Sequence, residues 1–343
     1  MRARRRPRGL LAAVAAASLL LTACGAGSGG DDTGGVGDSA DGGAAPLTVY
    51  ATTGYLADVV ANVAPAAEVT TMVGPGGDPH TYQPSTRDIE AILDADAVFW
   101  NGLHLEAQMI DQLESLGDRQ LAVGDQLPEE LLLDWPETDD EGKPLYDPHI
   151  WNSPEAWALV VESVADKLGA IDPAHSEEYA ANAAHYVDEI GAAAEEAAAL
   201  LADVPEPRIL ITGHDAFNYF GDTYDLGVRA TDFVSTEAVL SPEELSELAK
   251  LIAENRVPVI FQDNQANPQA ITSLKEAVRA LGWQVRVSNE ELYADSLGAE
   301  PGVDTYLGVF RHNARAVAEA LGTPESPAAP RASATPDARD EQP

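Results

Sequence analysis

The chain contains only one cysteine, Cys24, among its 343 residues. A single cysteine excludes an intrachain disulfide and a metal site built from several thiolates. Any transition-metal site must therefore use histidine, aspartate or glutamate side chains. Basic residues are also scarce, because Lys and Arg together number 20 against 57 Asp and Glu, for a formal net charge of −37. This charge repels nucleic acid and anionic lipid surfaces, so we expect no nucleic-acid partner.

The N-terminal segment lacks acidic residues and has only a short apolar run. Five arginines lie within residues 1–8, and the apolar residues 10–21 follow them. This run is too short to cross a bilayer comfortably, and it is typical of a secretion signal. The next residues, Leu21-Thr22-Ala23-Cys24-Gly25, resemble the bacterial lipobox, whose cysteine is lipidated and becomes the mature N-terminus. We therefore expect a lipoprotein signal peptide at 1–23 and an extracytoplasmic protein anchored to the cell membrane by a lipidated Cys24. An ordinary signal peptide with an accidental cysteine is the alternative.

Two segments of biased composition flank the remaining chain. Residues 24–46 are rich in Gly, Ser, Asp and Ala, which is typical of a flexible tether. Residues 323–343 are rich in Pro, Ala and Asp, and we expect them to be disordered. The folded part, residues 47–322, is long enough for two domains.

Short apolar runs alternate with helical patterns along this folded part. The first set of expected strands is 47–51, 68–73, 97–100 and 121–123, with helices near 55–63, 87–93 and 105–116. The second set of strands is 208–212, 228–234, 258–261 and 284–287. Such alternation predicts parallel sheets with helices on both faces. We predict an α/β fold with two lobes, each a roughly four-stranded parallel sheet flanked by helices.

One long helix is expected between the two sets of strands, at about residues 174–202. Its only helix breaker is Gly191, and Pro205 and Pro207 follow its end. The predicted organisation is a first lobe at 47–170, a connecting helix at 171–204 and a second lobe at 205–322. A helical connection is stiffer than a strand or loop, so we expect limited closure of the lobes. A large hinge rotation between matched ligand-bound and ligand-free structures would contradict this.

Other helix starts carry clear local signals. Ser153, Ser241 and Asn267 each precede a proline, which places a capping side chain before a proline at the first helical position. Ser241 with Glu244 also fits a capping box.

Three of the seven histidines have unusual surroundings. The tripeptide Asp-Pro-His occurs twice in expected loops, ending at His80 and His149. The proline stiffens the approach to the imidazole, and the aspartate could accept the other ring N–H. His214 directly follows the first strand of the second set, where residues of a doubly wound sheet face the ligand crevice. These positions predict a histidine-rich metal site. A fourth ligand is needed, and either Asp263 or Asp295 could supply it.

Several segments together resemble a known family. They are residues 74–84 (GPGGDPHTYQP), 98–106 (VFWNGLHLE), 147–153 (DPHIWNS), 213–220 (GHDAFNYF), 258–268 (PVIFQDNQANP) and 293–313 (YADSLGAEPGVDTYLGVFRHN). In this order and behind a lipobox, they resemble the metal-binding receptor lipoproteins of bacterial zinc and manganese ABC importers. The resemblance covers about residues 47–322.

The resemblance implies four metal ligands, His80, His149, His214 and Asp295, between two lobes joined by a long helix. In the family the third position varies between His and Glu, and the last acid lies in the segment that here reads YADSLG, which favours Asp295 over Asp263. It further implies bound Zn²⁺ or Mn²⁺, delivery to the permease of an ABC importer, and no enzymatic activity. We expect a monomer.

Zinc is the favoured metal, with manganese next. Three imidazoles and one carboxylate suit Zn²⁺ well, and a bidentate Asp would also suit Mn²⁺. Many zinc members have a His- and acid-rich loop before the second histidine, but residues 126–146 contain acids and no histidine. We interpret this stretch as a solvated charge run. We interpret His104, His175, His185 and His312 as spare, solvated or structural, and Trp100 and Trp151 as wall or core residues.

Three other function classes compete with metal transport. A zinc hydrolase would need an open coordination position and a general base, yet the chain has no His-Glu-x-x-His motif and no serine in Gly213-His214-Asp215-Ala216-Phe217. A surface adhesin would use the metal only structurally. A receptor for an organic ligand or chelated metal would need a roomy, aromatic-lined cleft.

Overall fold

The computed structural model describes residues 45–138, 142–232 and 240–322. The expected signal peptide, Cys24, nearly all of the tether and the 323–343 tail therefore lie outside the described residues. Within the described part, no helix is long and apolar enough to cross a membrane.

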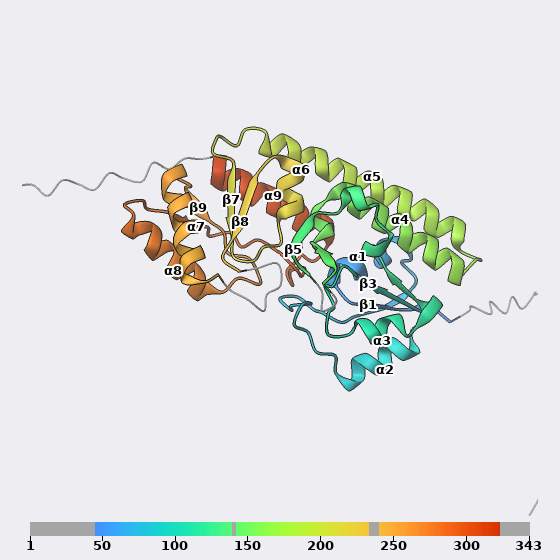
Figure 1. Cartoon of the computed structure of the whole chain (residues 1–343). Helices are drawn as coiled ribbons and strands as arrows, with labels where there is room; N and C mark the ends of the chain where they lie inside the picture. Colours follow the sequence, from blue (N-terminus) through green and yellow to red (C-terminus); the bar gives the residue numbers. More distant parts are fainter. Residues whose placement is uncertain (1–44, 139–141, 233–239, 323–343) are drawn as a thin grey trace, which may run out of the picture. The chain divides into compact units, whose positions relative to one another are not determined.

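The first sheet lies in the first predicted lobe and has four parallel strands in the order β2-β1-β3-β4. They are β1 (Thr48–Ala51), β2 (Glu68–Thr71), β3 (Ala97–Trp100) and β4 (Gln120–Ala122). Alternate residues of a strand face opposite sides, so β3 contributes Phe99 to one core and Trp100 to the other. Helix α1 (Gly54–Val63) covers the Phe99 face, and α2 (Thr86–Asp94) and α3 (Ile110–Glu114) cover the Trp100 face (Figure 1).

The second lobe also contains four strands in parallel pairs. Strand β7 (Ile209–Thr212) pairs with β8 (Gly227–Ala230), and β9 (Val259–Ile260) pairs with β10 (Arg286–Val287). The amide of Phe261 donates to the carbonyl of Ile211 at 2.8 Å, which joins the two pairs. Helices α7 (Pro242–Asn255) and α8 (Pro268–Ala280) bury one face, and α6 (Asn218–Tyr224) and α9 (Tyr306–Gly322) bury the other. This arrangement confirms the predicted α/β class with parallel strands flanked by helices.

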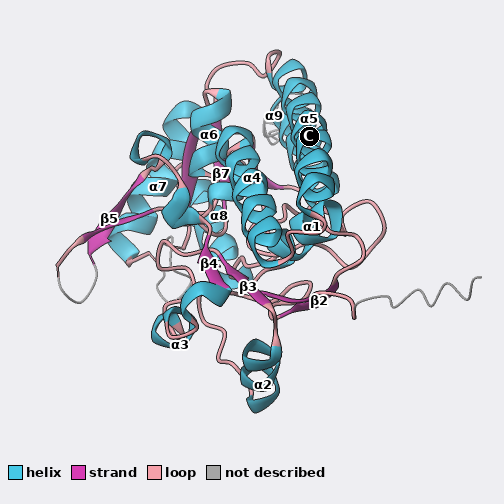
Figure 2. Ribbon diagram, turned by 90° about the vertical axis from the view of Figure 1, so that its right-hand side faces the viewer, coloured by secondary structure: helices cyan, strands magenta, loops and turns pink. Residues whose placement is uncertain are grey.

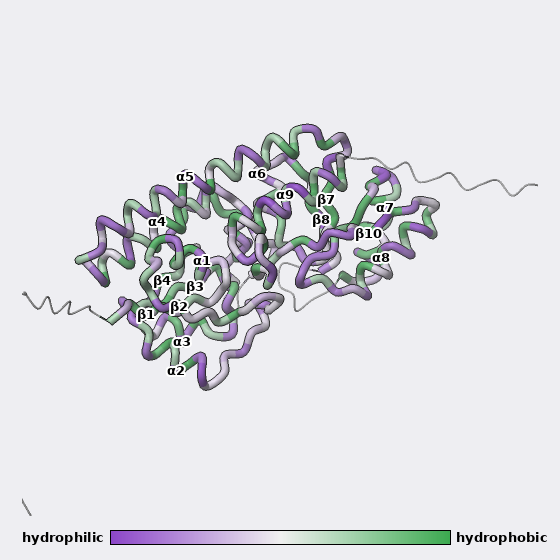
Figure 3. Tube along the Cα trace, turned by 180° about the vertical axis from the view of Figure 1, so that it is seen from behind, coloured by the Kyte–Doolittle hydropathy of each residue, from purple (hydrophilic) through white to green (hydrophobic). Residues whose placement is uncertain are grey.

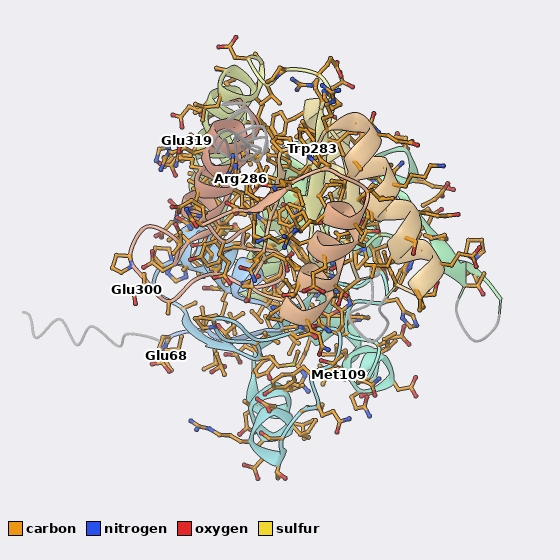
Figure 4. The ribbon with its side chains drawn as sticks, turned by 90° about the vertical axis from the view of Figure 1, so that its left-hand side faces the viewer. Glu68, Met109, Trp283, Arg286, Glu300 and Glu319 are labelled. Carbon is orange, nitrogen blue, oxygen red and sulfur yellow. The ribbon has the colours of Figure 1, made fainter. Side chains whose placement is uncertain are left out.

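Helix α9 is attached to the second sheet by polar as well as apolar contacts. The guanidinium of Arg286 donates to the carbonyl of Ala320 at 2.6 Å, and Figure 4 shows Arg286 beside Glu319 of α9. Trp283 packs against the core that α7 and α8 cover, and its indole N–H donates to the carbonyl of Val257 at 2.8 Å. These contacts fix the ends of the short strands β9 and β10.

Two long helices follow the first sheet. Helix α4 (Pro154–Ile171) packs along α5 (Ser176–Leu201), as Figure 2 shows, and α5 also packs against α1 and α9. Helix α5 is the long helix predicted at 174–202. In Figure 3 hydrophobic and hydrophilic residues alternate along α5, as expected of a helix with one buried face. The boundaries of the lobes at 170, 204 and 322 stay predictions.

The capping signals in the sequence are confirmed at all three predicted helix starts. Ser153 accepts from the amide of Ala156, Ser241 forms a capping box with Glu244, and Asn267 accepts from the amides at the start of α8. Each side-chain oxygen satisfies a backbone donor that the first helical turn leaves unpaired.

Several local predictions were wrong in extent or missed an element. The helix expected at 105–116 begins only at Ile110, because residues 102–104 have positive φ angles and form a turn. The strand expected at 228–234 ends at Ala230, and residues 233–239 lie outside the described part. Within the acidic stretch 126–146 there is an antiparallel pair, β5 (Asp134–Thr138) and β6 (Pro144–Tyr146), in which Trp135 is buried. The remaining short elements are the 3-10 helices η1 (Gly117–Arg119), η2 (Gly124–Gln126), η3 (Glu129–Leu131) and η4 (Ile150–Asn152).

Candidate metal centre

Four residues from distant parts of the chain meet in one buried cluster. His80 lies in the loop after β2, His149 directly before η4, His214 directly after β7, and Asp295 in the loop after β10. Their possible ligand atoms all lie within 4.8 Å of one another. His80 is 5% exposed and the other three are fully buried. The structure therefore brings together all four residues that the family resemblance implied.

The spacing of the donor atoms suits one small cation. The Nε2 atom of His149 lies 3.3 Å from Nε2 of His80 and 3.1 Å from Nε2 of His214. The carboxylate oxygens of Asp295 lie 3.3 Å from His149 Nε2, 3.1 Å from His214 Nε2 and 3.6 Å from His80 Nε2. Tetrahedral ligands at about 2.0–2.2 Å from Zn²⁺ are themselves separated by about 3.3–3.6 Å. The observed separations match these values within a few tenths of an ångström.

Asp295 is a fully buried carboxylate that faces the three imidazoles. Among the described residues, no well-aligned donor reaches either of its buried carboxylate oxygens. A buried carboxylate is costly unless a cation or several donors compensate for its lost hydration. A divalent ion between Asp295 and the three imidazoles would provide this compensation, so the donor set fits a metal.

The orientation of His149 is fixed by Asp147. Its Oδ1 accepts the backbone N–H of His149 at 2.9 Å and lies 2.7 Å from ring Nδ1. A proton on Nδ1 leaves the lone pair of Nε2 directed into the cluster, which is the arrangement that metal binding requires. Helix α6 supports Asp147 in turn, because Asn218 donates to Oδ2 at 3.0 Å and Tyr219 donates to its carbonyl at 2.9 Å.

Asp263, the other candidate for the fourth ligand, lies behind His214. Its Oδ2 accepts the backbone N–H groups of Gly213 and His214, each at 2.9 Å. A Cβ atom at position 213 would lie 2.3 Å from Cβ of Ala266, so only glycine allows this close approach. Burial raises the pKa of Asp263 to about 6. The structure thus assigns Asp263 to the support of the His214 loop.

Hydrogen bonds to the neighbouring residue Ala294 hold Asp295 in place. The hydroxyl of Tyr55 and the indole N–H of Trp151 both donate to the carbonyl of Ala294 at 2.9 Å. The amide of Ala294 donates to the side-chain oxygen of Asn264 at 2.8 Å. Trp151 thus positions Asp295 as well as forming the wall of the site. Sequence reasoning missed Tyr55, Asn264, Asn218 and Tyr219, because no local pattern marks residues that act across the fold.

Burial and neighbouring charges shift the pKa values of the clustered side chains in different directions. Burial lowers the pKa of His80 to about 3, so its imidazole is neutral at pH 7. Burial also disfavours a charged His149, but the adjacent carboxylates of Asp147 and Asp295 outweigh it and raise the pKa to about 10. Burial opposes ionisation of Asp295, yet His214 and His149 hold its pKa well below the usual value. A metal ion entering the cluster therefore competes with a bound proton.

The other histidines lie outside the cluster. The side chains of His175 and His185 are 55% and 78% exposed, on or beside α5, as predicted. The ring of His312 donates to the carbonyl of Glu291 at 2.8 Å, as expected of a residue with a structural role. His104 lies in the positive-φ turn after β3 and is not among the four clustered residues. Trp100 is buried, as expected of a core residue.

Comparison with known proteins finds relatives that are named for metal binding or metal uptake. The family model described as zinc-uptake complex component A, periplasmic, matches residues 49–320. The manganese-binding lipoprotein MntA of Bacillus subtilis is 33% identical over 92% of this chain and 99% of its own length. The iron-binding protein YfeA of Yersinia pestis is 29% identical over 92% of this chain and 96% of its own. The structure of the periplasmic zinc-binding protein TroA from Treponema pallidum matches with a TM-score of 0.75 and 31% identity, covering 81% of this chain and all of TroA.

Proposed function

The chain belongs to the family of zinc-uptake complex component A, periplasmic, and on this premise we propose that it captures a divalent transition metal outside the cytoplasm and delivers it to an ABC permease. His80, His149, His214 and Asp295 are the proposed ligands. The observation that carries the proposal is their enclosed cluster, in which the Nε2 atoms of three imidazoles lie 3.1–3.6 Å from the carboxylate oxygens of Asp295. The relatives named for manganese, iron and zinc support metal as the cargo.

Zinc is the proposed cargo, with manganese second. Three imidazole nitrogens and one carboxylate form a donor set that Zn²⁺ accepts in tetrahedral geometry. A site of this kind binds Zn²⁺ more tightly than Mn²⁺ by the Irving–Williams order, so the available metal also determines which ion is carried. The separations of 3.1–3.6 Å between donor atoms are compatible with tetrahedral Zn²⁺.

The proposed mechanism is capture and release without bond chemistry. Loops from both lobes enclose the ion, and binding displaces a proton from the cluster. The loaded protein docks on the permease, which separates the lobes and removes ligands from the ion. Lipidation of Cys24 would keep the monomeric protein at the membrane close to its permease, and residues 24–46 would act as the tether. The MntA relative is named a lipoprotein, which supports this anchor.

The burial of the cluster favours cargo capture over hydrolysis. A catalytic zinc site presents an open coordination position to its substrate. Here the four side chains are at most 5% exposed. This enclosure fits an ion that enters and leaves by movement of the lobes.

The ligand set is tested on the full chain, purified in detergent and stripped of metal. Zinc content is measured by mass spectrometry, and zinc affinity by competition with a chromophoric chelator. We expect one equivalent of tightly held Zn²⁺, and a loss of at least about 100-fold in affinity for His80→Ala, His149→Ala, His214→Ala and Asp295→Ala, since each removes one of four ligands. His185→Ala is the matched control, because this side chain is 78% exposed on α5. Retention of full affinity in all four variants would contradict the assignment.

A further inference from the structure

The turn after β3 has an unusual backbone. Gly102, Leu103 and His104 have consecutive φ angles of 75°, 51° and 68°. Leu103 and His104 are ordinary L-residues, for which the left-handed region costs of the order of 1 kcal/mol or more each. Such a conformation persists only where surrounding contacts hold it.

Several of the contacts that hold this turn converge on Glu106. Its Oε1 accepts the hydroxyl of Thr52 at 2.6 Å and the backbone N–H of Asn101 at 2.8 Å, and its Oε2 accepts the N–H of Gly102 at 3.2 Å. Glu106 is only 2% exposed. Burial raises its pKa to about 7 in spite of these donors. A buried carboxylate held by neutral donors needs a reason to be there, because an apolar side chain would fill the space at lower cost.

One partner of Glu106 reaches the loop that carries His149. The side-chain amide of Asn101 donates to the carbonyl of Pro148 at 2.9 Å, one residue before His149. The carbonyl of Asn101 accepts the amide of Gly124 at 2.8 Å, which ties the turn to the end of β4. The carboxylate of Glu106 holds the backbone N–H of Asn101. It therefore fixes the residue whose side chain positions Pro148.

The other partner reaches the loop that carries His80. The carbonyl of Thr52 accepts the amide of Val73 at 3.2 Å, where the chain leaves β2 for that loop. The amide of Thr52 donates to the carbonyl of Phe99 at 3.0 Å, so Thr52 also joins the end of β1 to β3. Glu106 thus lies at the point where the supports of both first-lobe histidines meet.

We propose that Glu106 is a positioning residue of the metal centre, which locks the turn after β3 and thereby holds the His149 and His80 loops at their binding distance. This inference rests on the proposed function of the cluster. It differs from a purely structural role, in which loss of the carboxylate would lower the free energy of unfolding but leave metal affinity and ligand geometry in the folded protein unchanged.

The test uses Glu106→Gln in the full chain. Glutamine has the same shape, but its amide N–H group would face the N–H donor of Gly102 or Asn101, which breaks part of the network. We expect zinc affinity to fall by about tenfold, the size of effect seen when an outer support of a metal ligand is removed. The visible absorption of bound Co²⁺ should also change, since its bands depend on ligand geometry. Glu114→Gln is the matched control, because Glu114 is exposed on α3, and it should leave both readouts unchanged.

Asn101→Ala tests the link separately, since it retains the carboxylate and removes the bond to Pro148. We expect a similar loss of affinity and a smaller combined effect in the double variant than the sum of the two. If Glu106→Gln does not fold, as judged by circular dichroism, Asn101→Ala decides: unchanged affinity overturns the proposal. Wild-type affinity and an unchanged Co²⁺ spectrum in folded Glu106→Gln overturn it too. Absence of zinc binding in the unaltered chain contradicts the proposed function itself.

Discussion

The tripeptide Asp-Pro-His is used twice in the metal centre, and its two copies are held differently. In both, the aspartate Oδ1 accepts the backbone N–H of the histidine at 2.9 Å. At Asp147 the same oxygen also lies 2.7 Å from the ring Nδ1 of His149. At Asp78 the second oxygen accepts the hydroxyl of Thr81 at 2.8 Å. The same local sequence thus forms the same turn, while the surroundings decide what the carboxylate does next.

The second lobe supports the two loops by different means. It reaches the His149 loop through Asn218 and Tyr219, which bond to the side chain and carbonyl of Asp147. It reaches the His80 loop through the backbone, since Gly76 N–H donates to Ser296 Oγ at 2.9 Å and Gln265 donates to the Gly77 carbonyl at 2.8 Å. The difference indicates that His149 is oriented by its side-chain partner and His80 by the path of its loop.

The largest expected difference between the copies comes from removing each aspartate charge. Asp147→Asn should weaken zinc binding by about 10–100-fold, because the carboxylate that orients His149 and increases its basicity is lost. Asp78→Asn should cost about threefold or less, because an asparagine oxygen still accepts the His80 N–H. Chelator competition measures both. Equal losses in the two variants would show that the copies are equivalent after all.

Both loops depend on Glu106, and its titration should be visible in the stability of the metal-free protein. The folded-state pKa is raised from 4.5 to about 7, so this contribution is fully present below pH 4.5 and is lost as pH rises through about 7. We expect Glu106→Gln to remove a decline of about 1–3 kcal/mol in unfolding free energy between those limits. Denaturant unfolding at pH 5 and pH 8 with a chelator present measures it. The same change in unfolding free energy between pH 5 and pH 8 in both proteins would contradict the assignment of this pH dependence to Glu106.

A smaller effect, on the rate of zinc release, should distinguish the His80 loop from the His149 loop. Ser296→Ala removes the acceptor of the Gly76 N–H and of one bond from the Asn264 side chain, and each hydrogen bond contributes about 0.5–1.5 kcal/mol. We expect zinc release to accelerate by about two- to tenfold, since the His80 loop opens more easily. Stopped-flow transfer of zinc to a chelator measures this rate. An unchanged rate would mean that Gln265 and the loop itself suffice.

The smallest effect on metal binding should come from a site remote from both loops. Ser241→Ala removes the capping box of α7 and should cost about 1 kcal/mol of unfolding free energy. Zinc affinity should stay within about twofold, since the cap at the start of α7 is not among the four clustered residues. Thermal unfolding and chelator competition on the same sample measure the two quantities. A matching loss of affinity would show that global stability, rather than local positioning, determines metal binding.

Local signals in the sequence predicted much of this protein. The alternating strands and helices, the caps at Ser153, Ser241 and Asn267, and the long helix α5 depend on contacts between near neighbours, so they are visible in the chain itself. The late start of α3 and the pair β5–β6 were not predicted. In the first case the Glu106 network holds a left-handed turn, and in the second the burial of Trp135 supports a strand pair in an acidic stretch.

By itself, the sequence determined which residues are available to a metal: one cysteine, and histidines repeated in Asp-Pro-His loops and at the end of a strand. Residue spacing left the fourth ligand open between Asp263 and Asp295, and the family resemblance favoured Asp295. Only the tertiary structure placed Asp295 within the cluster and Asp263 behind His214. The reason is physical: the position of a carboxylate relative to an imidazole far away in the chain depends on how two sheets and their helices pack. The same packing decides that Asp147 orients a ring while Asp78 holds a turn.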